Sequence, residues 1–89
     1  MTGRRTYPAS TERGVLDAEP GDYFKDEAGE WRGMTPNGIR VWLKNHHVEE
    51  HADGTITVVG GSWGSNSILA QGGPKTWHGF IERGVWRSC

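Results

Sequence analysis

Glycines divide this chain into short apolar runs, and their spacing limits the possible folds more than any other feature. The sequence has 14 glycines in 89 residues. Many fall between apolar runs, at Asp53-Gly54, Gly60-Gly61, Gly64, Gly72-Gly73 and Gly84. Glycine adopts the positive φ angles of tight turns at little steric cost. Short runs between such turns are typical of β-hairpins. The sequence therefore predicts an all-β or β-dominated domain, a small antiparallel sheet or sandwich of hairpins.

The turn signals place three hairpins along the chain. Each consists of two strand segments and a turn: 22–25 and 30–34 around 26–29, 48–51 and 55–59 around 52–54, and 75–81 and 85–88 around 82–84. The second is the clearest, because Ala52-Asp53-Gly54 separates two runs with β-type residues.

Two further segments are less regular. In 39–45, Ile39, Val41 and Leu43 alternate with polar or aromatic residues, which favours a strand, although Ile39, Trp42 and Leu43 would also share one face of a short helix. β-branched residues open the run, so we expect a strand. Residues 60–73 are rich in glycine and serine, so we expect them to form a connecting loop. Only the segment Ser67-Ile68-Leu69 interrupts this composition.

The length indicates one domain, and the composition of its first residues indicates a loosely attached N-terminal arm. Eighty-nine residues suffice for a single small core. Five tryptophans can supply much of that core, and Trp31, Trp77 and Trp86 lie within expected strands. Residues 1–20 carry Thr, Ser, Pro and mixed charges, so we expect a flexible N-terminal arm, with residues 21–89 forming the β-rich domain.

Charge and cysteine content limit the partners and the compartment. The net charge is −1, so no overall field draws the chain to nucleic acid or to an acidic membrane, and direct nucleic-acid binding is not expected. The single cysteine, Cys89, cannot form an internal disulfide, which indicates a reducing setting. No apolar run approaches the roughly 20 residues of a membrane span, and the first residues lack a signal-peptide core. We expect a cytoplasmic protein, in the cytosol of a host cell.

One histidine-rich segment could bind a metal ion. His47, Glu49 and His51 would point to the same side of a strand, and His78 could add a fourth ligand. Zinc or iron accepts such ligands. The simpler interpretation is a solvated strand face, because no CxxC or HExxH spacing is present. We therefore predict no cofactor and keep metal binding as an alternative function.

Two strings resemble catalytic motifs without their required setting. Gly60-Gly61-Ser62-Trp63-Gly64 fits G-x-S-x-G, but the nucleophile elbow needs a large α/β sheet and a following helix. Gly72-Gly73-Pro74-Lys75-Thr76 lacks the phosphate-loop spacing, and its proline removes an amide donor. The sequence therefore favours a protein that is not an enzyme.

Two features are candidate contacts for a partner. Acidic residues are dense between 17 and 30, and this stretch could bind a basic surface; its main members are Asp22, Asp26, Glu27 and Glu30. Trp63 lies among glycines and serines, so its ring must either pack back into the core or face outward as an exposed anchor for a partner. Trp42 is a further candidate, and the face of Arg40, Trp42 and Lys44 is the next to test. The alternative interpretation of the acids is an edge hairpin protected from aggregation by charge.

Four segments resemble a known family: 20–24, 35–38, His51-Ala52-Asp53-Gly54-Thr55-Ile56-Thr57-Val58, and the closing WHGFIERGVW of 77–86. The family consists of small uncharacterised proteins of tailed phages and prophages, classed as a domain of unknown function. The resemblance covers roughly residues 20–89, and the closing block is its most specific part. The family's usual Pro-Ser-Ile step is replaced here by 59–69, similar to an insertion, and larger relatives often carry cysteines where Thr35 and Asn37 stand.

The resemblance implies a phage or mobile-element origin. Short accessory proteins of this kind commonly bind and disable a host machine, so the expected function is inhibition of a host protein or ribonucleoprotein complex. A defence system is the most concrete target, in the manner of an anti-CRISPR protein. The alternatives are the metal-binding protein above, or a minor component of the virion or its assembly.

Overall fold

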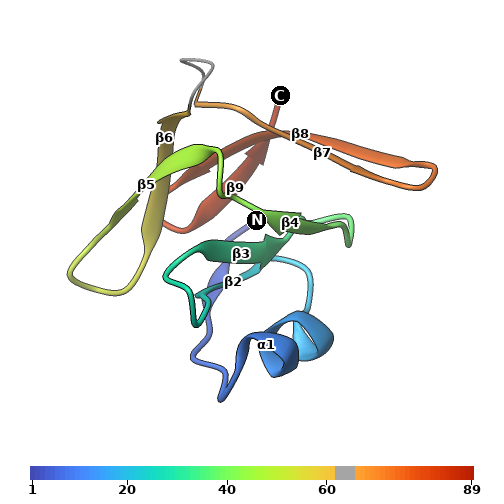
Figure 1. The fold of residues 1–89 in the computed structure, drawn as a ribbon. Helices are drawn as coiled ribbons and strands as arrows, with labels where there is room; N and C mark the ends of the chain where they lie inside the picture. Colours follow the sequence, from blue (N-terminus) through green and yellow to red (C-terminus); the bar gives the residue numbers. More distant parts are fainter. Residues whose placement is uncertain (62–65) are drawn as a thin grey trace.

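The computed structural model describes residues 1–61 and 66–89, and within them the chain is mostly β, with nine strands in three small sheets and one short helix (Figure 1). In chain order the elements are β1 (Arg4–Arg5), α1 (Thr11–Asp17), β2 (Asp22–Lys25), β3 (Trp31–Met34), β4 (Arg40–Trp42), β5 (His46–Glu50), β6 (Ile56–Gly61), β7 (Ile68–Gly72), β8 (Lys75–Glu82) and β9 (Val85–Ser88). The predicted fold class is confirmed.

The three sheets contain the three expected hairpins. One sheet has the order β1-β2-β3-β4, the second is the β5–β6 hairpin, and the third has the order β7-β8-β9. All pairs are antiparallel except β1 with β2, which is parallel. The β5–β6 and β7–β8 hairpins extend from opposite sides of the molecule, and α1 lies beside β2 and β3 (Figure 1).

The two ambiguous segments both contain strands. Residues 40–42 form β4, paired with β3 through Gly33 and Val41, so the strand interpretation of 39–45 is confirmed for these three residues, and a turn at 44–45 follows them. The predicted connection at 60–73 contains β7, which the sequence interpretation missed. Its signal was alternation, because Ile68 and Ala70 are buried while Leu69 is exposed.

The N-terminal residues pack against two sheets, which differs from the free arm expected from the sequence. Met1 and Gly3 are hydrogen-bonded to residues 84–86: the Trp86 N–H donates to the Met1 carbonyl at 2.8 Å, and the Gly3 N–H donates to the Gly84 carbonyl at 2.7 Å. The chain then forms β1 beside β2. Main-chain hydrogen bonds hold this segment, and composition carries little information about such bonds.

The helix α1 that follows is short, but it has an N-cap residue and packs on β2. The Ser10 Oγ accepts a hydrogen bond from the Arg13 N–H at 3.2 Å, which satisfies one amide of the first turn. A Cβ at Gly14 would lie 2.5 Å from the Phe24 ring. The small residue thus lets α1 lie directly on β2, and α1 covers only part of the outer face of this sheet.

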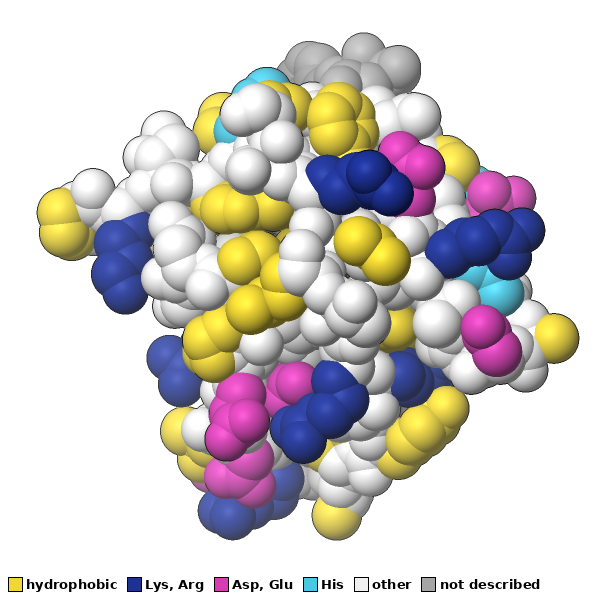
Figure 2. Space-filling model, turned by 180° about the vertical axis from the view of Figure 1, so that it is seen from behind, with side chains coloured by type: hydrophobic (Ala, Val, Ile, Leu, Met, Phe, Trp, Pro, Cys, Tyr) yellow, Lys and Arg dark blue, Asp and Glu magenta, His cyan; other side chains and the backbone are white. Residues whose placement is uncertain are grey.

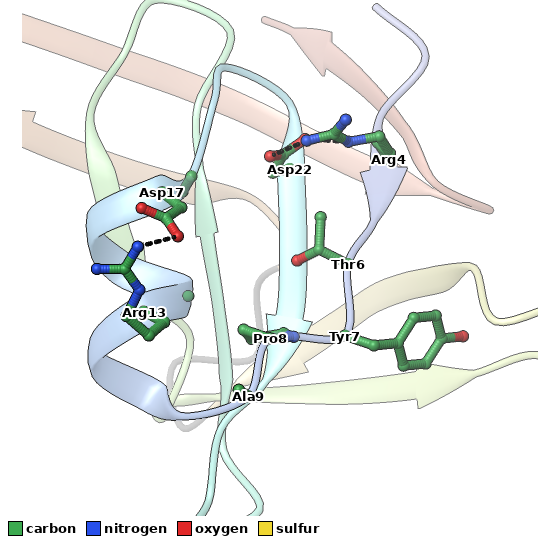
Figure 3. Close-up of a pocket in the computed structure, with 10 residues that line it drawn as sticks. Arg4, Thr6, Tyr7, Pro8, Ala9, Arg13, Asp17 and Asp22 are labelled. Carbon is green, nitrogen blue, oxygen red and sulfur yellow. Dashed lines mark hydrogen bonds and ion pairs between the residues drawn. The ribbon is translucent and has the colours of Figure 1, made fainter.

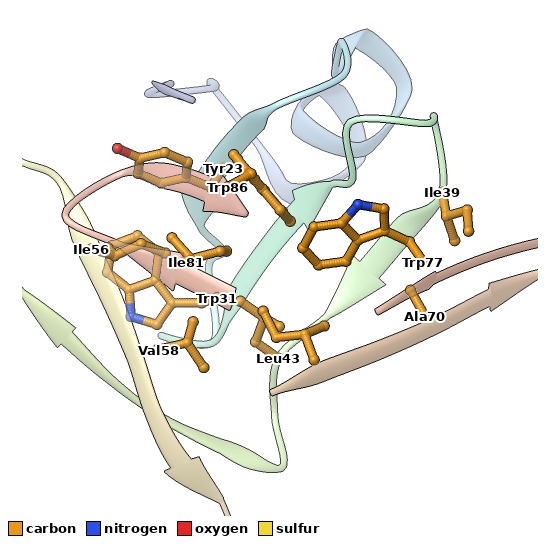
Figure 4. Close-up of a cluster of buried hydrophobic side chains, with 11 residues drawn as sticks. Tyr23, Trp31, Ile39, Leu43, Ile56, Val58, Ala70, Trp77, Ile81 and Trp86 are labelled. Atoms are coloured by element: carbon orange, nitrogen blue, oxygen red, sulfur yellow. The ribbon is translucent and has the colours of Figure 1, made fainter. Parts of the chain in front are cut away.

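The core lies between the sheets and is built around three tryptophans (Figure 4). Trp31, Trp77 and Trp86 are buried, as expected, and the Trp77 and Trp86 rings meet edge to face with centroids 5.5 Å apart. The Trp86 Nε1–H donates to the Gly21 carbonyl at 2.9 Å. A Cβ at Gly79 would lie 2.1 Å from the Arg87 carbonyl oxygen, so this position accepts only glycine. The other members of the core are Tyr23, Ile39, Leu43, Ile56, Val58, Ile68, Ala70 and Ile81.

No helix in the part of the chain that the structure describes has the length and apolar character needed to cross a membrane.

Candidate partner-binding surface

The outer face of the first sheet displays a half-exposed tryptophan. Side chains alternate along β4, so Val41 packs against the core while Trp42 points the other way, with 47% of its surface exposed. Arg32 of β3 lies directly opposite Trp42 in the antiparallel pair. We call Arg32, Arg40, Trp42 and Lys44 the Trp42 face.

Two cations contact the Trp42 ring. The Arg32 Cζ lies 4.3 Å from the ring centroid, and the Lys44 Nζ also lies 4.3 Å from it. Both distances are within the range in which the ring quadrupole attracts a positive charge. The indole is therefore held between two cationic side chains, while about half of its surface stays exposed.

A buried carboxylate fixes one of these cations. The Arg32 Nε–H donates to Asp26 Oδ2 at 2.9 Å, and the N–H groups of Ala28 and Glu30 donate to Asp26 Oδ1 at 3.0 and 2.9 Å. Burial alone would raise the pKa of Asp26, but these hydrogen bonds outweigh it and lower the pKa below its ordinary value. Asp26 thus stays ionised and positions Arg32.

A second cation on this face is fixed from the helix. The Arg40 Nε–H donates to the Val15 carbonyl, in α1, at 3.0 Å. A small cavity of about 100 Å³ lies beside it, between α1 and the sheet, lined mainly by Val15, Phe24, Arg40 and Trp42. Two arginines of the Trp42 face are therefore held in place before any partner arrives, which reduces the entropy lost on binding.

A groove adjoins the Trp42 face where the first and third sheets meet. β4 is an edge strand of the first sheet and β7 is an edge strand of the third sheet, and these two strands lie side by side. The cavity between them measures about 200 Å³, and we call it the β4–β7 groove. Its lining is apolar at Val41, Leu43, Ile68, Leu69 and Ala70, and polar or aromatic at Arg40, Trp42, His46 and Gln71. Burial lowers the pKa of His46. On the β7 side of the groove, Leu69 is 63% exposed.

The acidic residues expected to bind a partner do not form one surface. Asp22 is buried and accepts two hydrogen bonds from Arg4, Nε–H to Oδ1 at 3.0 Å and Nη2–H to Oδ2 at 2.8 Å (Figure 3). Asp26 is buried beneath Arg32. Both carboxylates therefore hold an arginine of this chain and are not available to a partner. Acidic residues that are close in sequence need not lie on the same face of a sheet.

The remaining two acids are closer to solvent. Glu27 is exposed and its Oε1 accepts from the Thr11 N–H at 2.8 Å, at the start of α1. Glu30 is half-buried, and its carbonyl accepts from the Asp26 N–H at 2.7 Å in the β2–β3 turn. Glu27 thus joins the start of α1 to the β2–β3 turn, and Glu30 closes that turn.

Trp63 lies outside the described residues, as do Ser62 and Gly64 of the G-x-S-x-G string. The exposed-anchor interpretation of Trp63 therefore stays a prediction from sequence.

The histidine-rich segment does not assemble a metal site within residues 1–61 and 66–89. These residues contain no group of three or more His, Cys, Asp or Glu side chains placed to hold a metal ion. His47 and Glu49 lie on β5, after a bulge, and His51 follows the strand, where its Nε2 lies 2.7 Å from Thr57 Oγ1. His78 lies on β8 opposite Leu69, in another sheet.

Two other cavities are less suited to a defined partner. A hollow of about 310 Å³ between β1, β2 and α1 has its main charges paired with each other, as Arg4–Asp22 and Arg13–Asp17 (Figure 3). A wide cleft of about 640 Å³ beside β6 and β8 carries both signs of charge; its charged lining comprises Glu49, His51, Glu82, Arg83 and Arg87. Neither cavity contains an exposed tryptophan among its lining residues.

Arg32 and the groove were not found from sequence. Alternation in 39–45 was enough to group Arg40, Trp42 and Lys44. Arg32 joins them only through the β3–β4 register, and β7 was taken for part of a connection.

Comparison with known proteins gives no relative. No family model, no curated protein and no solved structure matches the chain.

Proposed function

We propose that this protein acts by binding a macromolecular partner, without catalysis, and that the Trp42 face makes the central contact. The observation that carries this proposal is a half-exposed tryptophan in contact with Arg32 and Lys44, with Arg32 fixed by a buried carboxylate. Tryptophan and arginine are the residues most enriched among those that dominate interface energy. A face that is ordered in advance also loses less entropy on association.

The charge of this face favours an acidic protein surface as the partner. The charge of Arg32 is balanced by Asp26, so the net positive charge of this face comes from Lys44, at the ring, and from Arg40 on the same strand. Opposite charges across an interface speed encounter and fix orientation. A nucleic acid is the less favoured partner, because a phosphate backbone calls for an extended basic area. The net charge is −1, and basic and acidic side chains are intermixed over the back of the molecule (Figure 2).

The resemblance to phage and prophage proteins suggests which partner to seek. We propose a host complex, with a defence complex of the anti-CRISPR target type as the first candidate. Binding would inhibit such a complex by occupying an acidic surface that the complex needs for its own contacts.

The test is capture from a bacterial lysate with matched tryptophan and tyrosine variants. Trp42→Ala should lose the captured protein while melting within a few degrees of the parent, since the ring packs on the sheet surface. The control is Tyr7→Ala, which also removes an exposed ring stacked with an arginine, Arg5, on another part of the molecule. Tyr7→Ala should capture the partner normally.

Salt dependence identifies the role of charge. Lys44→Glu should weaken capture, and the loss should shrink as salt rises and screens the charges. A partner retained equally by Trp42→Ala, Lys44→Glu and the parent would refute the proposal, as would measured turnover of a substrate that depends on these residues.

A further inference from the structure

The cavity between α1 and the first sheet opens beside the Trp42 face, and we call it the α1 cavity. Its apolar lining includes the buried Phe24 of β2 and the half-buried Val15 and Ala18 at the end of α1. Arg40 and Trp42 also line it, and both are exposed, so the cavity is open to solvent at these residues. The helix has only seven residues and leaves this apolar surface uncovered.

The volume of the α1 cavity fits one small side chain. It measures about 100 Å³, whereas pockets for whole small molecules measure roughly 300–1,000 Å³. A dry, apolar cavity of roughly 150 Å³ holds one benzene ring. The space between these apolar walls therefore suits a group of about four carbons, such as the isobutyl group of leucine.

One cation at the rim of the cavity lacks a carboxylate. The Arg40 Nε–H donates to the Val15 carbonyl, and none of the ion pairs within residues 1–61 and 66–89 includes Arg40. Its two terminal nitrogens remain for a carboxylate, which guanidinium groups bind through parallel N–H···O bonds. Arg32 also lines the cavity, but it already has Asp26 as its partner. Arg40 therefore favours a negative group next to whatever fills the cavity.

We propose that the α1 cavity receives a leucine side chain of the partner, and that a carboxylate of the partner beside this leucine binds Arg40. The inference rests on the proposed function and names the anchor through which the partner is held. A side chain that fills a pocket beside a tryptophan is the kind of contact that dominates interface energy. The hydrogen bond between Arg40 and Val15 holds one wall in place, so less order has to be created on binding.

The probes are amino-acid derivatives that separate the aliphatic group from the charge. N-Acetyl-leucine carries both, N-acetyl-leucinamide lacks the charge, and N-acetyl-alanine keeps the charge with a methyl group in place of the isobutyl group. Binding to the whole protein is measured at low salt by NMR titration of the Trp42 indole N–H and the Val15 and Gly33 amides. We expect N-acetyl-leucine to bind at least about tenfold more tightly than N-acetyl-alanine. It should bind at least about threefold more tightly than N-acetyl-leucinamide.

Two matched substitutions in α1 locate the site. Val15→Phe places a ring in the α1 cavity and should weaken binding of N-acetyl-leucine at least about tenfold. Leu16→Phe is the control, because Leu16 is the next residue of the same helix, is exposed and does not line the α1 cavity. In the lysate experiment, Val15→Phe should lose the captured protein and Leu16→Phe should keep it, while both melt within a few degrees of the parent.

A third substitution tests the charge. Arg40→Gln should make N-acetyl-leucine and N-acetyl-leucinamide bind alike, because the cation that distinguishes them is gone. A preference for N-acetyl-leucine that survives this change would overturn the assignment of Arg40.

The other failures are distinguishable. N-Acetyl-alanine or inorganic phosphate that binds as tightly as N-acetyl-leucine would reduce the site to an anion contact and overturn the inference. Unchanged binding of N-acetyl-leucine by Val15→Phe would also overturn it, because the ligand would lie elsewhere. No binding of either leucine derivative, with lysate capture still dependent on Trp42, would refute the inference and spare the proposed function. Binding of N-acetyl-leucine in the cavity, with capture that does not depend on Trp42, would refute the proposed function and with it a partner's leucine as the occupant.

Discussion

The substitution Asp26→Asn tests how the binding surface is built, because it changes the carboxylate that holds Arg32 and leaves the shape nearly unaltered. The asparagine Oδ1 can keep the hydrogen bonds from the N–H groups of Ala28 and Glu30. Its amino group then replaces Oδ2 and faces the Arg32 guanidinium, so a charge-assisted hydrogen bond becomes a contact between two donors.

The magnitude follows from the burial of the two partners. A hydrogen bond to a charged group contributes about 1.5–3 kcal/mol, and breaking a fully buried ion pair costs about 3–5 kcal/mol. The Asp26 side chain is 2% exposed but that of Arg32 is 27% exposed, so water can solvate the released guanidinium in part. We expect a loss of about 2 kcal/mol in the free energy of unfolding. For a domain of this size that lowers Tm by roughly 8–16 °C.

The assay is thermal and urea unfolding of the parent, Asp26→Asn and a control. Glu82→Gln is the control, because it also neutralises one carboxylate but at an exposed strand position. In the Asp26→Asn background, Arg32→Gln should cost at least about 1 kcal/mol less than it does in the parent, because the pair is already broken. Equal melting of Asp26→Asn and Glu82→Gln, or full additivity of the two substitutions, would refute the assignment of Asp26 as the support of Arg32.

Three more predictions concern the fold. Gly79→Ala should lower the free energy of unfolding by about 3 kcal/mol, measured by urea titration, because its Cβ would overlap the Arg87 carbonyl; a neutral result would contradict the packing of β8 on β9. Removal of residues 1–3 should cost at least about 2 kcal/mol in the same measurement, since Trp86 loses main-chain partners, whereas a free arm would give no change. Burial lowers the pKa of His46 below its ordinary value of 6.5. As the pH falls below 6.5, the unfolded chain therefore binds a proton at His46 before the folded chain does, and the free energy of unfolding decreases. His46→Gln should flatten the dependence of Tm on pH in that window, and an unchanged profile would exclude His46 as its source.

The hairpins could be predicted from sequence because their turns are local. Asp53-Gly54 and Arg83-Gly84 both lie in turns, and Gly54 and Gly84 have φ angles of 88° and 77°. Such positions favour glycine whatever the surroundings. The burial of Trp31, Trp77 and Trp86 followed from the same hairpins, since apolar residues inside strands of a small domain have few other places to lie.

The candidate site was harder to predict, because it depends on register between strands far apart in sequence. Acidic residues in 17–30 form a cluster along the chain, yet Asp22 and Asp26 turn inward to Arg4 and Arg32. Nothing local distinguishes a carboxylate that anchors a cation from one that meets solvent. The groove likewise arises only when β4 and β7 are brought side by side.

The pairing of Met1 and Gly3 with residues 84–86 affects how this protein can fold as it leaves the ribosome. The Met1 ammonium and the Trp86 carbonyl that accepts its hydrogen bond are 85 positions apart in the chain. Contacts of such separation form slowly, because a long loop must close before they are gained. Until Trp86 emerges, the sheet formed by β1 to β4 lacks the Trp86 ring of the core, and residues 1–3 lack β9, the strand to which they are hydrogen-bonded. We expect the nascent chain to stay incompletely folded, with open strand edges, until residues 84–86 have been synthesised.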